Sequence, residues 1–133
     1  MPAHKVFADI TIRLVGVDAP ETFETKREPG QPFGQAATKY LTELVLNKTV
    51  TMREYGRDRY GRIFAVVFLN GTNINLEMVK AGLAEVYRGT PAPKFENEPY
   101  SQAEREAQAT GKGMCLQGDK YVSPRQWRKT HGN

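Results

Sequence analysis

Residues 12–22 read Ile12-Arg13-Leu14-Val15-Gly16-Val17-Asp18-Ala19-Pro20-Glu21-Thr22, an apolar run that ends in a polar turn. From Lys5 to Asp18 apolar and polar residues alternate, which predicts a half-buried β-strand with Arg13 on its polar face. Ala19-Pro20-Glu21 ends the strand, because proline fixes φ and has no amide hydrogen to give to a sheet. We expect a tight turn that brings the carboxylates of Asp18 and Glu21 toward one point.

The rest of the chain alternates strand and helix signals without an internal repeat, which is typical of an α+β fold. An OB-type barrel is one architecture that would bury these faces, although the pattern alone does not select it. The expected elements are a helix over 34–46, a hairpin of strands 49–55 and 62–69, a short helix that ends at Gly82, a strand over 83–87, an irregular stretch over 89–99 and a final helix that ends at Gly111.

The bulk numbers limit the class of protein. A length of 133 residues, 39% of them hydrophobic, fits one domain over 1–133. No apolar run is long enough to span a membrane, and the first residues have no leader pattern. A single cysteine, Cys115, and two histidines argue against a zinc site. The 19 Lys and Arg against 15 Asp and Glu give a net charge of +4, which is compatible with a polyanionic partner.

Two clusters could perform chemistry on a phosphodiester. Asp18 and Glu21 offer the oxygen ligands that calcium prefers. Arg13 lies before them, and Arg62 follows the turn 57–61, so two guanidinium groups are available to grip phosphate oxygens. With one carboxylate to activate water, these are the parts that in-line hydrolysis requires.

Each part also has a simpler structural explanation. An Asp-x-x-Glu pair after a strand is usually a solvated turn, and Arg13 on a polar strand face is usually an exposed ion pair. Charged hairpins discourage aggregation at sheet edges. Tyr60 and Tyr87 are more often half-buried packing residues than stacking residues. Composition and spacing therefore permit a phosphodiesterase without establishing one.

Residues 12–22 closely resemble the first signature of the staphylococcal nuclease family, and Asp58-Arg59-Tyr60-Gly61-Arg62 is similar to its second. The resemblance continues through 34–36, 75–84 and 104–107 in the expected order, so it covers nearly the whole chain. Two independent signatures in order are far more specific than either one alone.

The resemblance implies an OB-type five-stranded β-barrel with about three helices, and calcium-dependent cleavage of DNA or RNA. It assigns catalysis to Arg13, Glu21 and Arg62, and calcium binding to Asp18 and the backbone carbonyl of Ala19. Its implied substrate contacts are Arg59, Tyr60 and Tyr87. It also implies an exported location, whether extracellular, periplasmic or in the cell envelope.

The sequence departs from the family at its start, where the usual Asp-Gly-Asp-Thr segment has no counterpart. Two explanations stay open. The chain is part of a longer precursor, or a second chain supplies the missing strand in a homodimer formed by strand exchange. The departure also keeps an alternative function open, a nucleic-acid-binding OB-type module without turnover.

Overall fold

The computed structural model describes residues 10–19, 33–113 and 129. Its larger sheet is built on a hairpin of β3 (Thr51–Arg57) and β4 (Ile63–Leu69). Strand β1 (Ile12–Leu14) runs parallel to β4 on the other side, so the strand order is β1-β4-β3. The short β5 (Thr72–Asn73) also pairs with β4. This central strand is largely buried on both faces, as its apolar sequence predicts.

A second sheet has two short antiparallel strands, β2 (Val17–Asp18) and β6 (Glu85–Val86). The predicted unbroken strand up to Asp18 is therefore wrong, because β1 and β2 belong to different sheets. A turn at 15–16 separates them, and Gly16 has a left-handed φ of 79°. An alternating pattern cannot reveal this turn, since apolar residues continue on both sides of it.

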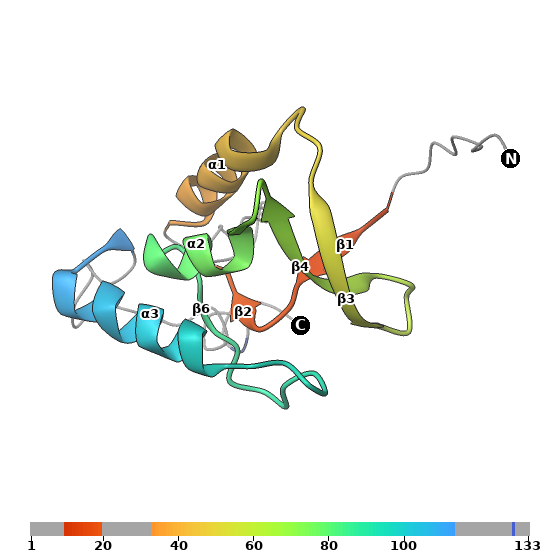
Figure 1. Cartoon of the computed structure of the whole chain (residues 1–133). Helices are drawn as coiled ribbons and strands as arrows, with labels where there is room; N and C mark the ends of the chain where they lie inside the picture. The colour runs from red at the N-terminus through yellow and green to blue at the C-terminus, as the bar shows by residue number, and fades with distance from the viewer. Residues whose placement is uncertain (1–9, 20–32, 114–128, 130–133) are drawn as a thin grey trace, which may run out of the picture.

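Three helices lie together on one side of the β3–β4 hairpin (Figure 1). They are α1 (Gly34–Val45), α2 (Ile74–Lys80) and α3 (Glu98–Thr110). The side chain of Asn73 caps α2 by accepting the amide hydrogen of Leu76 at 3.0 Å, which explains why this helix begins before its apolar pattern. Gly111 ends α3 in the left-handed conformation, as predicted.

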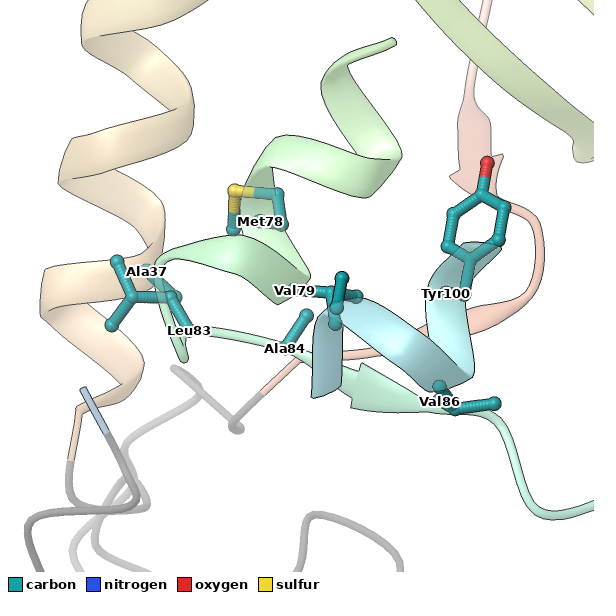
Figure 2. Close-up of a cluster of buried hydrophobic side chains, with 8 residues drawn as sticks. Ala37, Met78, Val79, Leu83, Ala84, Val86 and Tyr100 are labelled. Atoms are coloured by element: carbon teal, nitrogen blue, oxygen red, sulfur yellow. The ribbon is translucent and has the colours of Figure 1, made fainter. Parts of the chain in front are cut away.

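The main hydrophobic core lies where the helices meet β6. Figure 2 shows side chains from α1, α2, α3 and the segment around β6 converging there. Met78 and Val79 of α2 are 2% and 0% exposed. The buried members are Ala37, Met78, Val79, Leu83, Ala84, Val86, Tyr100 and Ala103.

A buried amide connects this helical layer to the larger sheet. Asn75 of α2 is 0% exposed. Its Oδ1 accepts the amide hydrogen of Val67, while its Nδ2 donates to the carbonyls of Val15 and Ala65 at 3.0 Å. Asn75 thereby fixes the turn that follows β1, and with it the places of Arg13 and Asp18.

The α+β class with three helices is confirmed. Among residues 10–19 and 33–113 the strands form two sheets, and no closed barrel is found there. Within the same residues no helix has the length and apolar character needed to cross a membrane.

Candidate nuclease site

Arg13 is the exposed middle residue of β1. It pairs in register with Phe64 of β4, and its guanidinium carbon lies 5.7 Å from the centroid of the Phe64 ring. This cation–π contact steers the arginine across the sheet surface. There it lines a cavity of about 340 Å³, which we call the first cavity. The other lining residues that matter here are Tyr55, Arg57, Phe64, Tyr87, Pro91, Pro93 and Asn97.

Tyr87 is held in the wall of this cavity by its neighbours. Its side chain folds over Gly89, where a Cβ would stand 2.2 Å from the Tyr87 hydroxyl. Arg88, the residue after Tyr87, donates to the carbonyl of Val86, the residue before it, and to the carboxylate of Glu104 on α3. Glu104 also accepts the amide hydrogen of Val86 at 2.7 Å, so hydrogen bonds to α3 hold the main chain of β6 next to the tyrosine.

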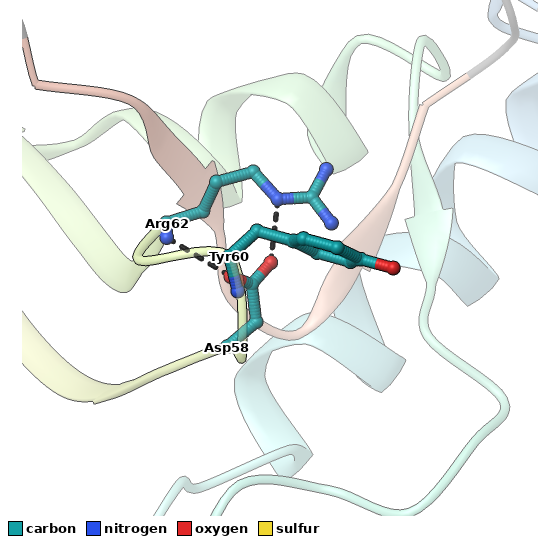
Figure 3. Close-up of polar contacts among 3 residues, drawn as sticks. All are labelled: Asp58, Tyr60 and Arg62. Atoms are coloured by element: carbon teal, nitrogen blue, oxygen red, sulfur yellow. Dashed lines mark hydrogen bonds and ion pairs between the residues drawn. The ribbon is translucent and has the colours of Figure 1, made fainter.

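Arg62 is positioned by a turn built around Asp58 (Figure 3). One oxygen of Asp58 accepts the amide hydrogens of Tyr60 and Arg62 at 2.8 and 2.9 Å. The other oxygen accepts the Nε hydrogen of Arg62. The amide of Gly61 donates to the Asp58 carbonyl at 3.0 Å, which closes the turn.

The pKa of Asp58 is lowered by these contacts. Partial burial acts to raise the pKa of this carboxyl. The hydrogen bonds from the main chain and side chain of Arg62, the amide of Tyr60 and the positive charge of Arg62 outweigh that effect and hold it below 3.8. The carboxylate is therefore charged at neutral pH and attracts the arginine.

Two guanidinium groups lie close to the ring of Tyr60. This residue is 71% exposed, and the guanidinium carbons of Arg59 and Arg62 lie 5.1 and 5.4 Å from its ring centroid. Tyr60, Arg62 and Arg57 line a cavity of about 370 Å³, the second cavity. Arg57 borders both cavities, so they adjoin at this side chain.

The predicted metal ligands Asp18 and Ala19 line neither of these cavities, although Val17, the neighbour of Asp18, lines the first. Asp18 is 6% exposed on β2, and its cross-strand partner Glu85 is 5% exposed on β6. Paired residues of neighbouring strands project from the same side, so two carboxylates stand side by side there. Ala19 follows Asp18 and is exposed. Glu21 lies outside the described residues.

The donor chemistry at this place fits a hard cation. Carboxylate and main-chain oxygens are what calcium prefers, and Asp18 with the carbonyl of Ala19 supplies one of each. No group of three or more His, Cys, Asp or Glu side chains that could hold a metal occurs in residues 10–19 and 33–113.

Two features of the site are not among those predicted from the sequence. The hydrogen-bonding role of Asp58 could have been inferred, since an aspartate at the start of a tight turn commonly accepts amide hydrogens from the following residues. The place of Arg57 between the cavities could not, because it depends on the pairing of β3 with β4 and of β4 with β1.

The sequence over most of the chain identifies its family. Residues 11–116 match the model of the Staphylococcal nuclease homologue family, and the chain belongs to that family. This confirms the predicted resemblance, and the predicted class of enzyme, a nuclease, is the class for which the family is named.

Proteins named as endonucleases are similar to this chain. It is 40% identical over 121 residues to a protein of Haemophilus influenzae named "Uncharacterized endonuclease", covering 90% of this chain and 61% of that protein. It is 36% identical over 132 residues to the "Probable endonuclease LCL3" of Paracoccidioides lutzii, covering 90% of this chain and 38% of that protein. The chain thus spans only part of the length of these relatives.

Proposed function

We propose that the chain is a nuclease that hydrolyses phosphodiester bonds of DNA or RNA by in-line attack of water, with calcium as its cofactor. The observation that carries the proposal is the placement of Arg13 and Arg62 on two adjoining cavities with aromatic walls, in a chain of the nuclease family. Guanidinium groups beside aromatic rings suit a strand that presents a phosphate backbone and unstacked bases.

Arg13 and Arg62 would hold the scissile phosphate. Each guanidinium is a planar cation that can give two hydrogen bonds to phosphate oxygens. The negative charge on these oxygens grows as water attacks, so both arginines stabilise the transition state more than the bound substrate. Glu21 would act as the general base that accepts a proton from the attacking water, the role that the family resemblance gives it.

Asp18 and the backbone carbonyl of Ala19 would hold calcium. A bound calcium ion would supply positive charge beside the phosphate and favour ionisation of a nearby water. The burial of Asp18 against β6 keeps its carboxylate in one place, which suits a ligand more than a freely rotating surface group.

Tyr87, Tyr60 and Arg59 would contact the rest of the substrate. Tyr87 borders the first cavity beside Arg13, where it could stack on a base next to the scissile phosphate. Tyr60 is broadly exposed, with Arg59 over its ring at the tip of the hairpin. Stacking of this kind needs bases that are free of a duplex, so we propose that single strands are cut more readily.

The larger sheet is proposed to form part of an OB-type five-stranded barrel. Its order, β1-β4-β3, leaves β3 at the end of the described sheet with its outer residues exposed. A further strand, from elsewhere in the protein or from a second chain, would pair there. Sedimentation that shows a folded monomer at micromolar concentration would rule out strand exchange. A single domain over 1–133 and an exported location also remain proposals from the resemblance.

The test is cleavage of a fluorescent single-stranded oligonucleotide with calcium, with a chelator, and by Glu21→Ala and Arg62→Ala variants. We expect cutting that needs calcium, disappears with Glu21→Ala and falls about 10²- to 10³-fold with Arg62→Ala. A folded protein that binds the strand equally with and without calcium, and cuts in neither case, would instead be a binding module.

A further inference from the structure

The two carboxylate oxygens of Asp58 serve different groups. Oδ1 accepts two main-chain amide hydrogens, from Tyr60 and Arg62, and so shapes the turn. Among the residues that the structure describes, Oδ2 accepts only from the Nε of the Arg62 side chain. The turn would need just the first oxygen, because an asparagine in the same place could accept both amide hydrogens. The second oxygen therefore acts on the orientation of Arg62.

The contact at Nε leaves the working end of Arg62 available. A guanidinium has five N–H groups, and Asp58 takes the single one on Nε. In the part of the chain that the structure describes, the terminal nitrogens make no hydrogen bond, and Figure 3 shows them beyond the contact with Asp58. The ring of Tyr60 lies 5.4 Å from the guanidinium carbon, which adds a second contact.

Holding the side chain at these two points limits its rotation. Arginine is among the side chains with the most rotamer freedom, and that freedom must be lost before a phosphate can be gripped by two nitrogens. The Arg62 side chain is 38% exposed and the Asp58 side chain is 13% exposed. The carboxylate is therefore the more buried member of the pair, and the arginine extends from it toward solvent.

We propose that Asp58 is a positioning residue for Arg62, holding the guanidinium so that its two terminal nitrogens face the phosphate in the second cavity. The proposal rests on the proposed nuclease function. It adds a residue to which neither the sequence motifs nor the family resemblance gave a role in the reaction. Asp58 does not touch the substrate in this scheme and acts only through Arg62.

The sharpest variant is Asp58→Asn. It keeps an oxygen for the two amide hydrogens but places an NH₂ group opposite the Nε hydrogen of Arg62, so the turn survives and the positioning contact is lost. We expect kcat for oligonucleotide cleavage to fall about 10- to 100-fold with little change in KM, because Arg62 acts most strongly in the transition state.

A matched control lies on α3, away from the lining of both cavities. Glu98 accepts from a terminal nitrogen of Arg105 at 3.3 Å, a carboxylate–arginine pair in an exposed position. Glu98→Gln should leave kcat and KM within about twofold of wild type, since exposed ion pairs contribute little. Equal losses in both variants would overturn the proposal, because any disturbed carboxylate–arginine pair would then have the same effect.

A double-mutant cycle separates positioning from other effects of Asp58. In an Arg62→Lys background there is no Nε–H to hold, so adding Asp58→Asn should change kcat less than twofold. An undiminished loss in that background would mean that Asp58 does not act through Arg62.

A spectroscopic measurement tests the contact without any need for activity. The ¹⁵Nε–Hε signal of Arg62 should be resolved and slow to exchange in wild type, and should move into the averaged arginine region in Asp58→Asn but not in Glu98→Gln. An unchanged signal in Asp58→Asn would overturn the positioning role. If wild type cuts nothing yet the signal behaves as expected, the proposed nuclease function fails while Asp58 still holds Arg62.

Discussion

At the scale of single residues, Arg62 and Tyr87 are oriented by neighbours that are close in sequence. Asp58 and Tyr60 flank the Arg62 side chain within one turn, and Gly89 makes room for the ring of Tyr87. Such contacts form inside one loop, so they can be removed one at a time without disturbing the core.

Asp58 should make the stability of the protein depend on pH in the acid range. Its pKa lies below 3.8 in the folded chain, so it stabilises the fold fully above the ordinary pKa of aspartate and ceases to do so as the pH falls through the folded value. We expect the melting temperature of Asp58→Asn to lie below that of wild type at pH 6, and the difference to shrink below about pH 4. Thermal unfolding from pH 7 to pH 2.5 measures it, and a gap that stays constant would contradict the lowered pKa.

Gly89→Ala should weaken substrate binding through Tyr87. The new methyl group would stand 2.2 Å from the tyrosine hydroxyl, and the φ of Gly89 is not left-handed, so the side chain moves and the backbone does not. We expect a loss of about 1 kcal/mol in single-strand affinity, the low end for a stacked base, with an almost unchanged melting temperature. Fluorescence anisotropy measures the affinity. Tyr87→Ala is the reference. If the double variant binds the single strand more weakly than Tyr87→Ala alone, the effect of Gly89→Ala does not act through the tyrosine side chain.

At the scale of elements, the connection between α2 and the sheet decides where the site lies. Asn75 reaches from the helix to β4 and to the turn after β1, and it satisfies three main-chain groups at once. Arg13 and Asp18 lie on opposite sides of that turn. One buried amide therefore sets the relative places of a candidate catalytic arginine and a candidate metal ligand.

Asn75→Ala should destabilise the fold by about 2–4 kcal/mol, because it removes the side-chain partner of the Val67 amide and of the Val15 carbonyl, while the Ala65 carbonyl keeps only the amide hydrogen of Val15. Urea unfolding followed by circular dichroism gives the free energy. Gln102→Ala is the control, an exposed amide on α3 for which we expect less than about 0.5 kcal/mol. A cost for Asn75→Ala no larger than that of the control would show that water replaces the amide.

Much of the element pattern could be predicted from the sequence, for identifiable reasons. The helix α1 and the β3–β4 hairpin have strong periodicity and clear turn residues, and Gly111 marks the end of α3. The turn at Gly16 could not be predicted, because its causes are distant in sequence. Asn75 holds the carbonyl of Val15, and the ring of Phe95 packs so closely that a Cβ on Gly16 would lie 2.2 Å from it.

The sequence names candidate site residues but does not give their arrangement. The motifs single out Arg13, Asp18 and Arg62, yet spacing does not say that they occupy two cavities and a separate two-stranded sheet. Those places follow from pairings between segments about fifty or more residues apart, which no local pattern contains.

At the scale of the whole molecule, stability depends on the helical core, since the larger sheet has a partly exposed outer strand, β3. Met78→Ala should cost about 2–5 kcal/mol, the usual range for emptying a buried methionine site. Total stabilities are about 5–15 kcal/mol, so this variant should approach unfolding at moderate urea concentrations. Met52→Ala on β3, where the side chain is 40% exposed, should cost far less, and equal costs would place the main core elsewhere.

The pairing of β1 with β4 and of β2 with β6 has a consequence for synthesis on the ribosome. Arg13 and Asp18 leave the exit tunnel early, but the strands that seat them are made only when residues 63–65 and 85–86 have followed. The nascent chain therefore carries these side chains without their arrangement until those later strands have left the ribosome. A protein proposed to cut RNA would acquire its cutting geometry only after that point in its own synthesis.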